Sequence, residues 1–156
     1  MKIEVGQEAP DFSLYDCDKN KVALSQLKGQ NVVLLFFPFA FTGTCTKELC
    51  SVRDNISLYN SVNAKVFGIS VDSIHSLKKY KEEQNLNFSL LSDFNKEAST
   101  SYGCLYDTFS FDMKGVSKRS AFIIDRTGII RYAEVLDKAT DLPDFEAIEN
   151  TLKSLN

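Results

Sequence analysis

Three short, uninterrupted runs of apolar residues divide an otherwise mixed chain, and each of them predicts a buried strand. The runs are NVVLLFFPF at 31–39, AKVFGISVD at 64–72 and FSLLSD at 88–93. They are rich in β-branched and aromatic residues and too apolar for a sheet edge, which is typical of central strands. Pro38 ends the first run, because a proline nitrogen has no hydrogen to donate to a sheet ladder.

Apolar residues at helical spacing predict the helices between these strands. From Thr44 to Tyr59 the apolar positions recur every three or four residues and form one face, made of Cys45, Leu49, Val52, Ile56 and Tyr59. Further helices are expected at 73–84, at 96–103 and at 142–156, with a short helical turn at 25–29.

Two pairs of strands complete the pattern. DFSL at 11–14 and KVAL at 21–24 flank the polar turn YDCDKN, which predicts an N-terminal β-hairpin. A second pair lies within 117–136, joined by the turn DRTG. The order of elements predicts an α/β, thioredoxin-like fold, in which a central mixed sheet carries helices on both faces. We expect one domain over residues 1–156.

Composition and charge narrow the class of protein. The chain is 44% hydrophobic and 25% charged, as expected of a globular protein, and its net charge of −3 favours neither nucleic acid nor an anionic membrane as a partner. The N-terminal stretch lacks the pattern of a signal peptide, and no run approaches the ~20 apolar residues that span a bilayer. We therefore expect a cytoplasmic protein, whose thiols are kept reduced.

Four cysteines, at positions 17, 45, 50 and 104, are the main candidates for chemistry. In a reducing compartment, cysteines are more often free, catalytic or metal-binding than parts of a disulfide framework. The compartment alone does not distinguish among these three roles. A zinc site is the weakest interpretation, because C-x4-C with His75 as the sole histidine supplies no four-ligand set.

Cys45 is the candidate nucleophile. It follows a buried strand and falls in the first turn of a predicted helix, where unpaired N–H groups and the helix dipole stabilise an anion. Thiols in such positions can have a pKa lowered from about 8.5 to about 3.5–7.5. Thr42 offers a hydroxyl in front of the thiol, Gly43 lets the backbone approach a ligand, and Pro38 shields the pocket from water.

A nucleophilic thiol also needs a positively charged or basic partner. His75 lies in a segment that is predicted to be a helix, and a lone histidine there is usually a surface or packing residue. We therefore expect no Cys–His pair. Arg119, at the head of the strand SAFIID, is better placed. A guanidinium stabilises a thiolate without taking up its proton.

These residues carry a resemblance to the peroxiredoxins. PFAFTGTC fits that family's active-site signature P-x-x-x-T-x-x-C through Pro38, Thr42 and Cys45, while Glu48 and Arg119 match its glutamate and arginine. Two further stretches are typical of the family, APDFSL at 9–14 and GISVDS at 68–73. The resemblance covers essentially the whole chain. It implies a thioredoxin-fold peroxidase that needs no metal, haem or flavin cofactor.

The resemblance also implies roles for the site residues. Cys45 attacks the terminal O–O bond of a hydroperoxide, and Thr42 and Arg119 hold the peroxide oxygens together with backbone N–H groups. Glu48 holds Arg119 by a bidentate pair. The product is a sulfenic acid at Cys45, for which Cys50 is the expected resolving thiol.

The pair CTKELC resembles the bacterioferritin-comigratory, or peroxiredoxin Q, branch, whereas AFTGTC is more similar to the alkyl hydroperoxide reductase E branch. Residues five apart in an intact helix have Cα atoms about 8.6 Å apart. A disulfide tolerates at most about 7 Å, so a Cys45–Cys50 bond requires the first helical turn to unwind.

Several alternatives remain open at this point. Cys50 can be a core residue, in which case an external thiol recycles a one-cysteine peroxidase, and Cys104 can resolve in its place. A thiol redox sensor without efficient turnover fits the same residues. A thiol–disulfide oxidoreductase would want C-x-x-C, and here the second cysteine is two positions too far. Thioredoxin, glutaredoxin and a low-molecular-weight thiol are the candidate reductants, and a homodimer through loops near the site is expected.

Overall fold

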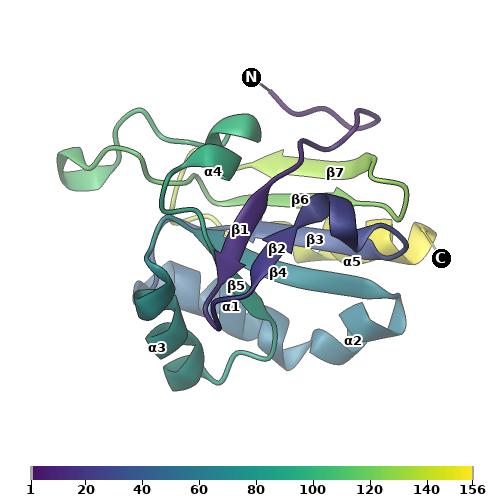
Figure 1. Cartoon of the computed structure of the whole chain (residues 1–156), viewed down its shortest axis with the longest axis horizontal. Helices are drawn as coiled ribbons and strands as arrows, with labels where there is room; N and C mark the ends of the chain where they lie inside the picture. Colours follow the sequence, from purple (N-terminus) through teal and green to yellow (C-terminus); the bar gives the residue numbers. More distant parts are fainter. Residues whose placement is uncertain (1, 156) are drawn as a thin grey trace.

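A computed structural model describes residues 2–155 of the chain, and its centre is a mixed sheet (Figure 1). The seven strands lie in the order β2-β1-β5-β4-β3-β6-β7. Their bounds are β1 Ser13–Asp16, β2 Lys21–Ala23, β3 Asn31–Phe36, β4 Ala64–Ser70, β5 Ser89–Ser92, β6 Ser120–Ile124 and β7 Ile130–Val135. β3 pairs parallel to β4 and antiparallel to β6, and β1 and β2 form the predicted antiparallel hairpin. The thioredoxin-like fold expected from the sequence is confirmed.

Helices cover both faces of this sheet (Figure 1). The bounds are α1 Gly43–Asp54, α2 Ile56–Ser61, α3 Ile74–Gln84, α4 Glu97–Ser101 and α5 Phe145–Ser154, with 3₁₀ turns η1 Leu24–Leu27 and η2 Ser110–Asp112. Because strand side chains alternate, Val33 and Leu35 of β3 point to one core with α1, α2, α3 and α5. Leu34 and Phe36 point to a second core with α4 and η1.

The single helix expected from Thr44 to Tyr59 is wrong at one place, because the structure divides it at Asn55. This residue has φ −116° and ψ 17°, and its backbone N–H donates to the Val52 carbonyl at 3.1 Å. Its side-chain amide donates to the Ser51 carbonyl at 2.9 Å. An asparagine that bonds to the neighbouring backbone competes with the helical pattern, so the chain ends α1 there and restarts as α2.

The C-terminal helix expected at 142–156 is shorter in the structure. Asp144 caps α5 by accepting a hydrogen bond from the Ala147 N–H at 3.1 Å, directly after Pro143. The last residue of the predicted range, Asn156, lies outside the described residues. Within residues 2–155, no helix is long and apolar enough to cross a membrane.

Candidate active site

The sheet brings two distant segments to the same edge. β3 and β6 run antiparallel, with Phe36 opposite Ser120, so the residues after β3 and the residue before β6 emerge together. After β3 the chain passes through buried Pro38 and enters α1, whose N-cap is Thr42. Immediately before β6 stands Arg119, which therefore lies close to the start of α1.

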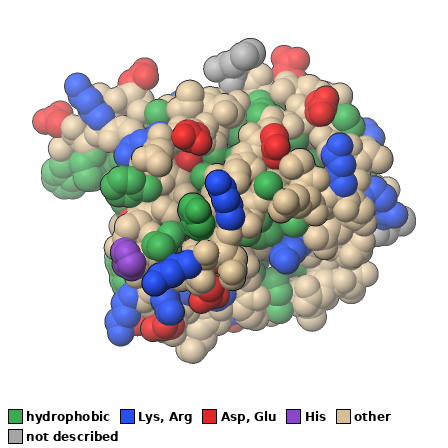
Figure 2. All heavy atoms as spheres, viewed as in Figure 1, with side chains coloured by type: hydrophobic (Ala, Val, Ile, Leu, Met, Phe, Trp, Pro, Cys, Tyr) green, Lys and Arg blue, Asp and Glu red, His purple; other side chains and the backbone are tan. Residues whose placement is uncertain are grey.

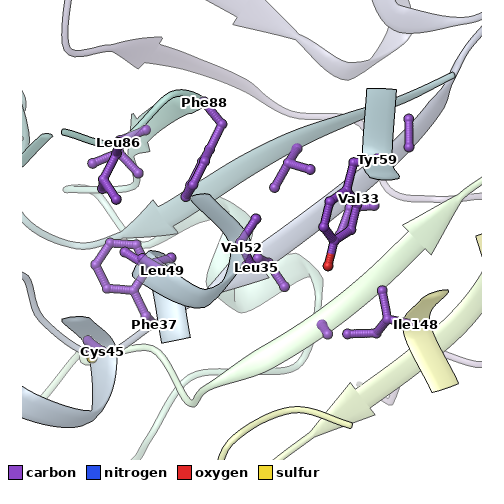
Figure 3. Close-up of a cluster of buried hydrophobic side chains, with 14 of the residues drawn as sticks. Val33, Leu35, Phe37, Cys45, Leu49, Val52, Tyr59, Leu86, Phe88 and Ile148 are labelled. Carbon is purple, nitrogen blue, oxygen red and sulfur yellow. The ribbon is translucent and has the colours of Figure 1, made fainter. Parts of the chain in front are cut away.

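Cys45 is the third residue of α1 and only 1% exposed. Figure 3 shows its side chain at one end of the core cluster that also contains Phe37 and Leu49. The Thr46 N–H already donates to the Thr42 carbonyl at 3.0 Å, whereas the N–H groups before it precede the helical ladder. The thiol thus lies at the positive end of the helix dipole, as the sequence predicted.

Arg119 connects three acceptors at this edge. Its Nη2 donates to Cys45 Sγ at 3.3 Å and to the Ala139 carbonyl at 2.9 Å, and its Nη1 donates to Glu48 Oε1 at 2.6 Å. The guanidinium is 1% exposed, so little solvent screens these contacts. Burial alone would lower the pKa of Arg119, but Glu48 and Cys45 together raise it, which keeps the cation charged.

The bidentate Glu48–Arg119 pair expected from the sequence is wrong, because a single hydrogen bond joins the two side chains. Arg119 divides its donors among three acceptors, and within the described residues Glu48 Oε2 and Arg119 Nε are buried without a hydrogen-bond partner. Burial raises the pKa of Glu48 to about 7, against the opposing effect of Arg119. Burial thus favours the neutral form of this carboxyl more than water does.

Thr42 is exposed at the mouth of the site, and its hydroxyl donates to the Phe39 carbonyl at 2.9 Å. The hydrogen of this hydroxyl is thus engaged, and its lone pairs are what it can offer to a bound ligand. Gly43, the next residue, has open space where a Cβ would stand.

Cys50 lies five residues, about 1.4 turns, after Cys45 in the same helix. Its thiol is partly buried and contacts Gln84 Oε1 of α3 at 3.6 Å. All four cysteines are free, and α1 is continuous between Cys45 and Cys50. Cys17 belongs to the same core as Cys45, whereas Cys104 lies in the core on the opposite face of the sheet.

Two contacts of the site had no signal in the sequence. The Ala139 acceptor is a backbone carbonyl, which any residue provides. Thr46 Oγ1 and Tyr80 OH, from α1 and α3, lie 2.9 Å apart. His75 is exposed in the first turn of α3, consistent with the surface role expected of it. Among residues 2–155, no group of three or more His, Cys, Asp and Glu side chains could hold a metal ion.

Comparison with known proteins gives one consistent result. Residues 5–133 match the AhpC/TSA family. The chain is 40% identical to a Coxiella burnetii peroxiredoxin named bcp, over 83% of this chain and 87% of that one. It is 37% identical to alkyl hydroperoxide reductase E of Mycobacterium bovis, over 85% and 86% of the two chains. The crystal structure of peroxidoxin BcpB from Mycobacterium tuberculosis superposes with a TM-score of 0.87 at 28% identity, covering 99% of both chains.

Proposed function

The chain belongs to the AhpC/TSA family and is a peroxiredoxin, a thiol peroxidase, and on this premise we propose that Cys45 is its peroxide-reactive thiol. The observation that carries the proposal is the 3.3 Å contact from the Arg119 guanidinium to Cys45 Sγ at a helix N-terminus. The other residues of the site are Pro38, Thr42, Glu48 and Arg119.

The first step is displacement at oxygen. The Cys45 thiolate attacks the terminal oxygen of the hydroperoxide, the O–O bond breaks, and the remaining oxygen leaves with its electron pair and takes up a proton. Arg119 and the free N–H groups at the start of α1 stabilise the charge that develops on the oxygens. Thr42 accepts a hydrogen bond from the hydroperoxide O–H, since its own hydrogen is donated to Phe39. Cys45 is left as a sulfenic acid.

Glu48 and Pro38 support this step without reacting. The 2.6 Å hydrogen bond from Arg119 to Glu48 fixes one arm of the guanidinium, so that the other arm faces the thiol. Pro38 is buried between β3 and the loop that leads to α1, where it keeps water from the apolar side of the thiol. Hydrogen peroxide and alkyl hydroperoxides both carry the O–H and O–O groups that this site addresses.

Cys50 is the proposed resolving thiol. It lies on the same helix as Cys45 and is partly accessible, so unwinding of the first turn of α1 brings the two sulfurs together. Cys104 is a poor alternative, because it is fully buried on the other face of the sheet, and burial raises its pKa to about 12. We propose re-reduction of the disulfide by thioredoxin or a similar thiol donor in the cytoplasm.

A homodimer through the loops near the site is the proposed assembly. The segment between α4 and β6 projects from the body of the molecule and carries exposed hydrophobic side chains (Figures 1 and 2). Phe111 is 94% exposed there, and Phe41, beside the N-cap of α1, is 52% exposed. Exposed aromatic residues of this size favour burial against a second copy.

Peroxide turnover with each reductant, measured for the wild type, Cys45→Ser and Cys50→Ser, tests the proposal. We expect Cys45→Ser to be inactive with every reductant. Cys50→Ser should complete one oxidation but lose its cycle with thioredoxin. Persistent turnover in Cys45→Ser would contradict the role of Cys45. If Cys50→Ser turned over with thioredoxin at the wild-type rate, an external thiol and not Cys50 would reduce the sulfenic acid. A wild-type protein that consumes one equivalent of peroxide and stops would be a redox sensor.

A further inference from the structure

The first turn of α1 is tied to α3 by one buried tyrosine. Thr46, the residue after Cys45, lies with its hydroxyl 2.9 Å from the hydroxyl of Tyr80. Tyr80 is 0% exposed, and its ring packs between Phe37, at a centroid distance of 6.4 Å, and Phe41, at 5.1 Å. The hydrogen bond therefore joins the first turn of α1 to a side chain that is fixed by packing in the core.

Helix α3 also contacts Cys50, at the other end of the segment between the two cysteines. Gln84, at the end of α3, accepts from Cys50 Sγ at 3.6 Å through its side chain and from Arg53 Nη1 at 2.5 Å through its carbonyl. The helical segment that must unwind for a Cys45–Cys50 bond is thus attached to α3 at both of its ends. Unwinding of the first turn moves Thr46 and breaks its bond to Tyr80.

We propose that Tyr80 is a positioning residue, whose hydrogen bond to Thr46 holds the first turn of α1 folded and so sets how the Cys45 sulfenic acid divides between two fates. This inference rests on the proposed function of Cys45 and Cys50. While the turn is folded, the sulfenic acid stays in the pocket where a second hydroperoxide binds. Once it unwinds, the acid is within reach of Cys50.

Both fates balance. In the first, the Cys50 thiolate attacks the sulfenic sulfur, the S–S bond forms as the S–O bond breaks, and the oxygen leaves as hydroxide, which a proton converts to water. In the second, the sulfenate attacks the O–O bond of another hydroperoxide, which is reduced to an alcohol or water while the sulfur is oxidised to a sulfinate.

The tie is independent of pH in the physiological range. Burial raises the pKa of Tyr80 to about 12, so its hydroxyl keeps its hydrogen at neutral pH. The phenol and the Thr46 hydroxyl can each donate or accept, and the bond survives either orientation. Tyr80→Phe removes the bond and leaves the ring packed against Phe37 and Phe41.

Hydrogen exchange of the reduced protein tests the tie without any peroxide chemistry. We expect Tyr80→Phe to speed amide exchange over residues 46–49, whose N–H groups close the first turn of α1, by about two- to tenfold. This is what a net hydrogen bond of ordinary strength would give. Thr46→Val removes the other partner and should have the same effect, with no further gain in the double variant. Unchanged exchange in Tyr80→Phe would overturn the proposal.

Tyr102→Phe is the matched control. Tyr102 is likewise 0% exposed and its hydroxyl donates to the Pro10 carbonyl at 2.7 Å, but it lies in the core on the other side of the sheet. Its substitution removes one buried tyrosine hydrogen bond and should leave exchange at residues 46–49 unchanged. An equal acceleration in Tyr102→Phe would reduce the effect of Tyr80 to a general loss of stability and contradict a positioning role.

The ratio of disulfide to sulfinate, measured by mass spectrometry after graded additions of hydrogen peroxide, then tests the consequence. We expect this ratio to rise about two- to tenfold in Tyr80→Phe and Thr46→Val, and to keep its wild-type value in Tyr102→Phe. An unchanged ratio despite faster exchange would overturn the proposal. If instead no Cys45–Cys50 disulfide forms in any variant, the fault lies with the proposed resolving role of Cys50, and the exchange data still decide whether Tyr80 holds the turn.

Discussion

Cys45 and Cys104 are buried thiols on the two faces of the sheet. Arg119, just before β6, donates to Cys45 Sγ at 3.3 Å, whereas the hydroxyl of the next residue, Ser120, donates to the Lys118 carbonyl at 2.9 Å. The two cysteines are 1% and 0% exposed, each in its own core. Cys45 has a guanidinium and a helix N-terminus beside it, whereas burial raises the pKa of Cys104 to about 12.

If Cys45 has the proposed role, burial alone does not decide whether a cysteine is reactive. In an apolar environment, burial disfavours the thiolate and leaves a cysteine as a small hydrophobic residue. Where burial also excludes water from a positive charge, the same low polarity strengthens the attraction between that charge and a thiolate. The side chains of β6 alternate between the two cores, with Ala121 and Ile123 in the core of Cys45 and Phe122 and Ile124 in the core of Cys104.

The largest expected effect comes from exchanging the two thiols for inert residues. Cys45→Ser should lower the rate of peroxide reduction by several orders of magnitude, because a serine hydroxyl is a far weaker nucleophile at neutral pH. Cys104→Ala should keep the wild-type rate and lose only some stability from the smaller core side chain. Stopped-flow peroxide consumption and thermal melting measure both. Loss of the fast reaction in Cys104→Ala at a temperature where it is folded would break the contrast.

The next effect isolates the guanidinium. Arg119→Met keeps much of the volume but removes the charge and the donor to Cys45, and we expect the rate of the first oxidation to fall by about 10²–10³. Arg119→Lys should recover only part of this loss, because an ammonium lacks the planar fork that reaches Cys45, Glu48 and the Ala139 carbonyl together. Single-turnover kinetics give both rates. A rate for Arg119→Met within twofold of the wild type would remove Arg119 from the chemistry.

The smallest effect concerns stability and comes from Glu48. Its pKa in the folded protein, about 7, lies above its ordinary value of 4.5, so the native state binds the extra proton between these values. The stability that this proton contributes is fully present below about pH 4.5 and is lost as the pH rises through 7. Glu48→Gln removes the titration, so the stability of the wild type relative to this variant should fall from pH 5 to pH 8.

The midpoints of unfolding in guanidinium chloride, measured for both proteins at pH 5, 6, 7 and 8, give that difference in stability. Carrying out the comparison in a Cys45→Ser background excludes any contribution from titration of that thiol. Parallel curves for the two proteins would show that Arg119 keeps Glu48 ionised across this range, and would contradict the raised pKa.

The parts of the fold and site that could be predicted are those with a local pattern. The apolar run of β3 and the spacing of Cys45, Leu49 and Val52 locate a thiol at a helix start. Arg119 was identified because its strand follows in a recognisable order and matches a family motif. The break at Asn55 does not follow from the spacing of apolar residues, because the apolar pattern continues to Tyr59 while a local hydrogen bond from Asn55 ends the helix.

Contacts between segments that are distant in the chain have no local pattern in the sequence. Thr46 and Tyr80 are 34 residues apart, and nothing in their neighbours indicates that their hydroxyls meet. A single hydrogen bond joins Glu48 and Arg119, although Glu48 Oε2 and Arg119 Nε are both buried without a partner among the described residues. Which donors remain for a given acceptor is decided by tertiary packing, so the bidentate pair predicted from residue types was wrong.

Trapping of the sulfenic acid distinguishes Cys45 from Cys104 most directly. The Cys50→Ser variant, which lacks the proposed resolving thiol, is treated with one equivalent of hydrogen peroxide and dimedone. Each cysteine peptide is then examined by mass spectrometry. We predict a dimedone adduct on Cys45 alone, with Cys17 and Cys104 unmodified. Adducts on Cys17 or Cys104 in yields comparable to that on Cys45 would contradict the conclusion that Arg119 and the start of α1 make one buried thiol reactive.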